Sequence, residues 1–266
     1  MAEGSPLLVC ETVSKLYGAL AAVDGFSLAV ARGEILGIGG PNGAGKTTLF
    51  DVISGIAPAT AGRVLLEGID ITRWSPDRIC RAGLLRTFQM NAAFDSLSIR
   101  ENVEIAAYFG SGKRRLSGLT IDRAAREAAS AALDVVSLGK ADRLARDLPV
   151  LDRKLLMIAS ALAAKPKLIM LDEPVGGLAP GEIDAVVNVV RATAATGVTV
   201  ILIEHVMRFL LALSERVVIM HQGKTLFEGP PRGVAEDRKV AETYLGTATT
   251  ARLKRFYEVE VEQNDR

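Results

Sequence analysis

The segment from Gly40 to Thr48, which reads GPNGAGKTT, constrains this chain more than any other stretch of its sequence. Its spacing, G-x-x-x-x-G-K-[ST], puts glycines where backbone N–H groups must turn toward a polyphosphate. An apolar run at Glu34–Ile38 precedes the loop, and Thr47–Ser54 follows it with a helical pattern. Strand, glycine loop and helix in this order predict a phosphate site at a helix start, where the helix dipole favours anions.

We expect the phosphates of a nucleotide to contact the loop and the first helical turn, at Asn42, Gly43, Ala44, Gly45, Lys46, Thr47 and Thr48. Lys46 can reach the β- and γ-phosphates, and the hydroxyl of Thr47 can bind Mg²⁺. The alternative is a glycine-rich turn that carries Lys-Thr by chance, and the flanking strand and helix patterns argue against it.

A second apolar run, Leu168–Leu171, leads directly into Asp172 and Glu173. A buried strand that delivers acids at its carboxyl end suits the nucleotide site of an α/β fold. We predict that Asp172 holds Mg²⁺ through water and that Glu173 polarises an attacking water as general base. The alternative, an exposed acidic pair after a core strand, is disfavoured by the phosphate loop upstream.

Composition excludes several classes of protein. A net charge of +1 over 266 residues argues against a nucleic-acid surface. The longest apolar runs are far shorter than the ~20 residues of a membrane helix, and the start of the chain does not have the pattern of a signal peptide. Cys10 and Cys80 are isolated in the sequence, without the spacing of a metal or redox site, and two free thiols suit the cytosol. We therefore expect a cytosolic protein, which can still dock on a membrane protein.

Strand-like runs alternate with helical patterns, which predicts a mostly parallel sheet flanked by helices. The early segments 7–13 and 25–30 instead read as strands of a small antiparallel sheet. Segment 91–164 has a mainly helical pattern, and a hairpin is expected around Gln222-Gly223.

Three further residues point to one family. The chain resembles the ATP-binding subunits of ABC transporters over nearly its whole length. Gln89, in Arg-Thr-Phe-Gln, matches the Q-loop glutamine, and His205, in Ile-Glu-His, matches the switch histidine. The resemblance implies that Gln89 contacts Mg²⁺ and the attacking water, and that His205 contacts the γ-phosphate. Tyr17 matches the aromatic residue that stacks on adenine. Singly these could be a surface glutamine, a core histidine and a core tyrosine, but their order and spacing favour the site.

The resemblance also implies a fold of the α/β class: a RecA-like P-loop ATPase core with an N-terminal antiparallel β subdomain and an inserted helical subdomain. We expect one ABC ATPase domain over residues 1–246, with its core at about 1–90 and 163–246 and its helical subdomain at about 91–162. Residues 247–266 would form a C-terminal tail. Such a domain binds ATP with Mg²⁺ and hydrolyses the ATP.

Three segments narrow the resemblance to subunits of the LivG type: SLSIRENV at 96–103, IEH at 203–205 and AETYLG at 241–246. In that group two different ATPase subunits serve a membrane permease, to which a periplasmic binding protein delivers branched-chain amino acids or related molecules. The resemblance implies a peripheral importer subunit on the cytoplasmic face of the inner membrane, with no nucleic-acid partner. ATPases of lipopolysaccharide exporters share much of this pattern and remain an alternative.

The chain departs from its family where a signature close to Leu-Ser-Gly-Gly-Gln is expected. In the head-to-tail dimer of the family, that signature holds the γ-phosphate bound to the opposite subunit. Here the position reads LPVLD, from Leu148 to Asp152. Pro149 has neither a hydroxyl nor an N–H group, and Val150 and Leu151 carry side chains where the backbone should approach phosphate. Asp152 adds an anion near the helix start, which would cancel much of the attraction of the helix dipole for phosphate.

A second departure lies in the D-loop, Gly177–Pro180, where Ala179 replaces a carboxylate or amide. The altered signature and D-loop would serve the nucleotide of a partner subunit. The residues that match the family, such as Lys46, Glu173 and His205, would serve the nucleotide that this chain itself binds. We therefore hypothesise a heterodimer with one competent and one impaired site. A regulatory or structural nucleotide-binding subunit that hardly hydrolyses ATP is the alternative, and the retained Glu173 and His205 argue against it. A soluble ABC protein or a small GTPase fits less well, since the chain has neither paired domains nor a guanine-reading sequence.

Overall fold

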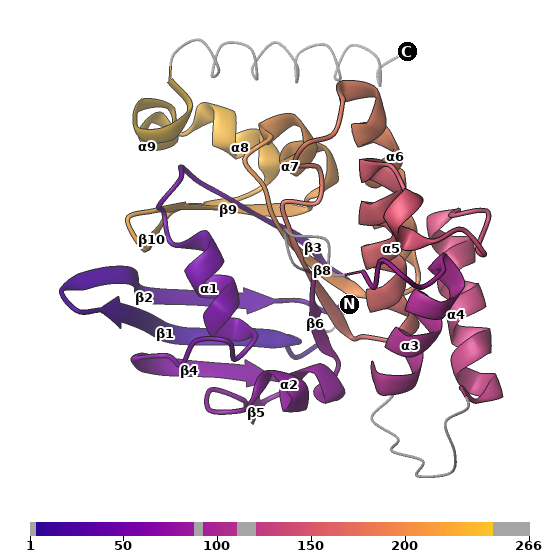
Figure 1. The fold of residues 1–266 in the computed structure, drawn as a ribbon. Helices are drawn as coiled ribbons and strands as arrows, with labels where there is room; N and C mark the ends of the chain where they lie inside the picture. Colours follow the sequence, from indigo (N-terminus) through magenta and orange to yellow (C-terminus); the bar gives the residue numbers. More distant parts are fainter. Residues whose placement is uncertain (1–3, 88–92, 111–120, 247–266) are drawn as a thin grey trace.

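The computed structural model describes residues 4–87, 93–110 and 121–246 of the chain. Two sheets and a set of helices make up this part of the molecule (Figure 1). None of the helices in these ranges is long and apolar enough to cross a membrane.

The larger sheet has six strands in the spatial order β10-β9-β3-β8-β7-β6, and all neighbours are parallel except the β9–β10 pair. The strands are β3 (Ile35–Gly39), β6 (Leu84–Arg86), β7 (Leu168–Asp172), β8 (Thr199–Ile203), β9 (Arg216–His221) and β10 (Lys224–Gly229). Ile203 lies opposite both Ile38 and Asp172. The carboxyl ends of β3, β7 and β8 are therefore level, so the residues that follow them meet at one edge of the sheet.

The smaller sheet is antiparallel, with the order β2-β1-β4-β5. It contains β1 (Leu8–Tyr17), β2 (Leu20–Val30), β4 (Ala61–Leu66) and β5 (Ile69–Asp70). The predicted antiparallel sheet is confirmed, with strands longer than the predicted segments 7–13 and 25–30. The predicted hairpin is also present between β9 and β10. Its turn residues Gln222 and Gly223 have φ values of 47° and 78°, as a tight hairpin turn requires.

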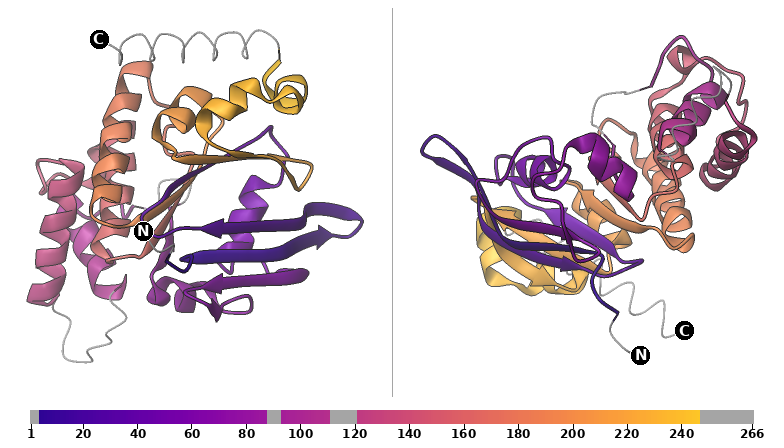
Figure 2. Two further views of the ribbon diagram at one scale, coloured as in Figure 1. Left: turned by 180° about the vertical axis from the view of Figure 1, so that it is seen from behind. Right: turned by 90° about the horizontal axis from the view of Figure 1, so that it is seen from below.

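The helices are α1 (Lys46–Ile53), α2 (Pro76–Ala82), α3 (Ile99–Gly110), α4 (Arg123–Val136), α5 (Val150–Ala163), α6 (Pro180–Ala195), α7 (Met207–Leu213), α8 (Pro231–Glu236) and α9 (Arg238–Val240), with short turns η1 (Ala145–Asp147) and η2 (Ala241–Leu245). Figure 2 shows α3, α4 and α5 together on one side of the molecule, away from the antiparallel sheet. They account for the helical pattern predicted for 91–164.

Alternating apolar residues of the central strands feed two cores on opposite faces of the larger sheet. Ile169 and Leu171 pack with α3 to α6, whereas Leu168 and Met170 pack with α1 and the antiparallel sheet. Burial on both faces explains why these strands read as continuous apolar runs. Helix α1 lies between the two sheets (Figure 1), and its Phe50 is fully buried there. The α/β fold class predicted from the sequence is thus confirmed.

Candidate functional site

The phosphate-binding loop joins the end of β3 to α1, as predicted. Lys46 is the first residue of α1, and its ammonium group donates hydrogen bonds to the carbonyl oxygens of Gly40 (2.7 Å) and Pro41 (2.9 Å). The side chain thus curls back over its own loop. Asn42, Gly43 and Thr47 are exposed, Ala44 is buried, and Gly45 and Thr48 are partly buried.

Two glycines of the loop have no room for a side chain. Gly40 and Gly45 have φ values of 143° and 99°, in the region that favours glycine. A Cβ atom on Gly45 would overlap the carbonyl oxygen of Ala22, and one on Gly40 would overlap that of Met220. The loop is therefore closely packed against β2 and β9, which fixes the direction of its N–H groups.

The acidic pair and the histidine come together at the carboxyl edge of the larger sheet. Asp172 ends β7, and Glu173 follows with a φ of 48°, which is unusual for a residue with a side chain. Its N–H donates to Ile203 (3.0 Å), and its carbonyl accepts from the ammonium of Lys154 (3.1 Å). His205 Nδ1 lies 3.7 Å from Glu173 Oε1. These contacts over-determine the strained backbone, as is common at functional sites.

The electrostatics connect the loop with the acidic pair. Burial lowers the pKa of Lys46, while the charges of Glu173 and Asp172 act to raise it. Burial likewise raises the pKa of Asp172, and the hydrogen bond and charge of Arg86 oppose that rise. Lys46 and the two acids thus share one electrostatic environment, with opposite charges close enough to interact.

Asp172 offers a ligand for a metal in one particular way. Its Oδ2 accepts a hydrogen bond from Arg86 (2.7 Å), and its buried Oδ1 has no hydrogen-bond partner among the described residues. In those same ranges, no group of three or more His, Cys, Asp and Glu residues could hold a metal by itself. Asp172 is a residue of the type that Mg²⁺ binds, because this ion usually takes one or two carboxylates together with substrate phosphates.

The sequence did not point to two residues with buried side chains that contact the predicted site. Arg86 ends β6, next to the strand that delivers Asp172; a cation and an acid at the ends of neighbouring strands would have been the signal. Glu204 is completely buried, and its carboxylate accepts the N–H groups of Val175 (3.0 Å), His205 (3.1 Å) and Val206 (3.3 Å). It joins the segment after Glu173 to the segment that carries His205.

The structure gives less information on the two remaining predicted residues, Tyr17 and Gln89. Tyr17 is 51% exposed at the end of β1, with the Lys15 ammonium 4.9 Å from its ring centre. Its hairpin partner β2 contacts the phosphate loop through Ala22. Gln89 lies outside the described residues.

The segment predicted at the signature position forms the start of a helix. Pro149 is the N-cap and α5 begins at Val150, which is two residues before Asp152. Val150 is 52% exposed. The carboxylate of Asp152 forms an ion pair with Arg143, whose Nη1 atom lies 3.8 Å away. In the D-loop segment, Ala179 caps α6 and makes no side-chain hydrogen bond there.

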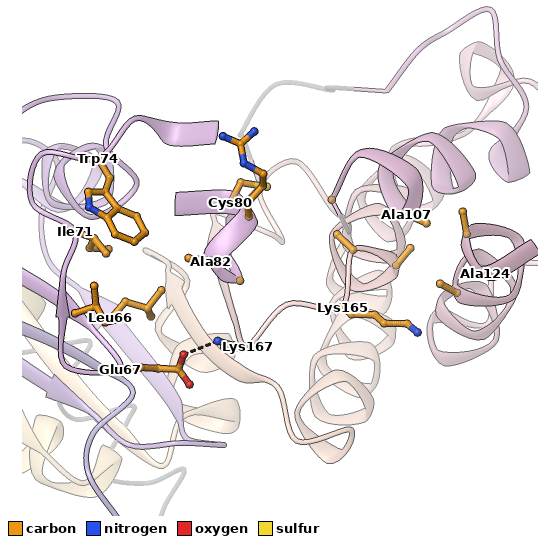
Figure 3. A pocket seen from close by; sticks show the side chains of 18 of the residues that line it. Leu66, Glu67, Ile71, Trp74, Cys80, Ala82, Ala107, Ala124, Lys165 and Lys167 are labelled. Carbon is orange, nitrogen blue, oxygen red and sulfur yellow. Dashed lines mark hydrogen bonds and ion pairs between the residues drawn. The ribbon is translucent and has the colours of Figure 1, made fainter. Parts of the chain in front are cut away.

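A cavity of about 670 Å³ lies elsewhere, between β4, α2 and the helices α3 to α5 (Figure 3). Figure 3 shows Trp74 on one side of it and Ala107 and Ala124 on the other, with an ion pair between Glu67 and Lys167 at its edge. None of the predicted nucleotide-site residues that the structure describes lines this cavity. It is therefore separate from the site built around Lys46.

Comparisons with known proteins agree with this geometry. A family model described as "ABC transporter" matches residues 23–176. The chain is 33% identical to the high-affinity branched-chain amino acid transport ATP-binding protein BraF of Pseudomonas aeruginosa and 34% identical to LivG of Escherichia coli K12, in each case over 91% of this chain and 99% of the relative.

Solved structures agree as well. A nucleotide-free ATP-binding cassette from an ABC transporter matches with a TM-score of 0.81 and 33% identity, over 91% of this chain and 99% of that one. The ADP conformation of an ATP-binding cassette matches with a TM-score of 0.82 and 33% identity, over 91% and 100%. The chain therefore belongs to the ATP-binding proteins of the ABC transporter family and is an ATPase of that type.

Proposed function

We propose that this chain energises the import of branched-chain or related amino acids by hydrolysing ATP. The names of its relatives support the substrate class, because the match extends over nearly their whole length. The chain would work on the cytoplasmic face of the inner membrane. Its partners would be integral permease subunits, a second ATPase subunit and, indirectly, a periplasmic substrate-binding protein.

The observation that carries the proposal is the convergence of Lys46, Asp172, Glu173 and His205 at one edge of the sheet. The loop N–H groups and Lys46 would hold the β- and γ-phosphates, and Tyr17 would stack on the adenine ring. Bound Mg²⁺ would neutralise charge on the phosphates. Thr47, Asp172 and Gln89 would hold that ion. The atom of Asp172 available for it would be Oδ1, which has no hydrogen-bond partner among the described residues.

Glu173 would orient and deprotonate the water that attacks the γ-phosphate, and His205 would contact that phosphate. The strained backbone of Glu173 and its two flanking hydrogen bonds support this role, since a general base must be held in one position. Gln89 would complete the site as the residue that touches both metal and water.

We further infer that the chain forms an asymmetric heterodimer. The start of α5 has a proline cap and an exposed valine where the family holds the partner's γ-phosphate. The competent site would then combine this chain's phosphate loop with an intact signature from the other subunit. The same observation favours a second candidate, a subunit that closes on ATP but hardly hydrolyses it.

The test is ATP turnover of the complex that this chain forms with its permease, comparing wild type, Glu173→Gln and Glu242→Gln. Glu242 is a matched control, because it is an exposed acid whose one ion pair among the described residues is with Arg238. We expect Glu173→Gln to lower turnover by about 10²–10⁴-fold while ATP binding is retained. Unchanged turnover would instead support the nucleotide clamp, with the working site in the other subunit.

A further inference from the structure

We propose that Arg86 is a positioning residue that holds Asp172 in the orientation in which its Oδ1 atom can serve the metal. This inference rests on the proposed function, in which Asp172 supports Mg²⁺ at the nucleotide. It adds a residue that lies outside the phosphate loop and the acidic pair, on a different strand.

Arg86 connects three segments of the chain through one buried guanidinium group. Nη2 donates to Asp172 Oδ2 at 2.7 Å, and Nη1 donates to Asp51 Oδ1 at 2.5 Å. The side chains of Arg86 and Asp172 are only 6% and 2% exposed. The guanidinium also lies 5.5 Å from the ring centre of Phe50, which neighbours Asp51 on α1. The contacts with Asp51 and Phe50 thus hold the guanidinium group in place beside Asp172.

The bond to Asp172 leaves the two carboxylate oxygens in different states. Oδ2 is held by Arg86, whereas Oδ1 is buried and has no hydrogen-bond partner among the described residues. A carboxylate pinned at one oxygen cannot rotate freely, so Oδ1 keeps one direction. An unpaired buried oxygen costs free energy, and a metal or its bound water would satisfy it.

Stability alone is a poor explanation for this arrangement. A buried ion pair often contributes less than well-packed apolar residues would, because desolvation offsets the Coulomb attraction. Groups that orient a metal ligand, in contrast, are often worth about 10–100-fold in metal affinity or activity. Arg86 also precedes Gln89 by three residues, so its strand leads directly into the segment that carries the predicted Q-loop glutamine.

The test measures metal binding directly, on the full chain with a non-hydrolysable ATP analogue. Mn²⁺ would be titrated and its free form followed by electron paramagnetic resonance, for wild type, Arg86→Met, Arg86→Lys and Asp51→Asn. Arg63→Met is the control, since Arg63 forms an exposed ion pair with Glu11. Thermal unfolding and binding of the analogue without metal would be recorded for each variant.

We expect Arg86→Met to weaken Mn²⁺ binding by about 10–100-fold, with metal-free binding of the analogue little changed. Arg86→Lys and Asp51→Asn should have smaller effects in the same direction, because each keeps part of the bridge. Arg63→Met should match wild type. If Arg86→Met does not fold, the lysine and asparagine variants carry the test alone.

Unchanged Mn²⁺ binding in these variants would overturn the inference. Tighter binding would also overturn it, because Arg86 would then merely compete with the metal for Asp172. Asp172→Asn separates this failure from that of the proposed function. If that variant loses Mn²⁺ binding while the Arg86 variants do not, Asp172 keeps its role and only the positioning role fails.

Discussion

The starts of α1 and α5 can be compared directly, because we expect a bound phosphate at the first and, from the family resemblance, a phosphate-binding signature at the position of the second. Helix α1 follows a glycine loop and opens with Lys46, whereas α5 follows Pro149 and opens with the exposed Val150. Both helices bury apolar residues against the larger sheet. The comparison shows that two helices with very different starts, a glycine loop and a proline cap, can both be packed in the core.

The largest effect is expected from Gly45→Ala, which tests the intact region. The new Cβ would meet the backbone carbonyl of Ala22 at a φ of 99°, so the start of α1 must shift and ATP binding should be lost. Gly43→Ala is the matched control: its φ is 78° and the space around it is open, so it should cost only the left-handed backbone, about 1–2 kcal/mol. Titration with a fluorescent ATP analogue and denaturant unfolding would separate the two. Equal ATP affinity in both variants would contradict the role of close packing.

The second largest effect is expected at the start of α5. Restoring the signature by Pro149→Ser, Val150→Gly, Leu151→Gly and Asp152→Gln should revive hydrolysis at the partner's nucleotide. In a complex that also carries Glu173→Gln, phosphate release should rise by about 10²–10³-fold, the usual worth of backbone donors aimed at developing charge. If turnover stayed at the level of the Glu173→Gln complex, the defect would lie outside the start of α5.

A smaller effect is expected from Glu204→Gln, at the junction behind the intact site. Its buried carboxylate accepts three backbone N–H groups, and an amide cannot replace both oxygens as acceptors. We expect a loss of about 1–3 kcal/mol in the free energy of unfolding, together with slower turnover. Glu182→Gln is the control, since the carboxylate of this half-buried glutamate accepts a single backbone N–H group among the described residues, that of Ala179. Urea unfolding measures both, and a larger loss in the control would refute the reasoning.

The smallest effect is a pH dependence of that same variant. Burial raises the pKa of Glu204 above its ordinary value of 4.5, although backbone N–H groups and His205 oppose this. The folded chain therefore keeps this proton to a higher pH than the unfolded chain. The stability that the protonated Glu204 side chain contributes is complete below pH 4.5, and it is lost as the pH rises through the pKa of Glu204 in the folded chain. The deficit of Glu204→Gln should narrow from acid toward neutral pH, and a widening deficit would reverse the sign of this argument.

Much of the fold could be read from the sequence because local signals coincide with the tertiary structure. The loop before Lys46, the apolar run before Asp172 and the Gln222-Gly223 turn each carry their own residue pattern. Strands β4 and β6 were not predicted, since short partly exposed strands lack a clear alternation.

The candidate site divides in the same way. The residues that carry a motif were predicted, and the structure brings Lys46, Asp172, Glu173 and His205 into one environment. Arg86 and Glu204 were not predicted, because the hydrogen bonds that connect them with the site are to partners 86 and 29 residues away in the chain. Such contacts leave no trace in local spacing.

The packing of the phosphate loop also has a thermodynamic consequence. The turn between β9 and β10 bonds to the loop through Gly223 N–H and Ala44 (3.0 Å), and to β2 through Asp24 N–H and Gly223 (2.9 Å). The loop is thus preorganised by both sheets, and its loss of conformational entropy belongs to folding instead of to nucleotide binding. Substitutions in this hairpin turn, which is distant from the loop only in sequence, should therefore change ATP affinity mainly through entropy, although no residue of the turn is predicted to touch the nucleotide.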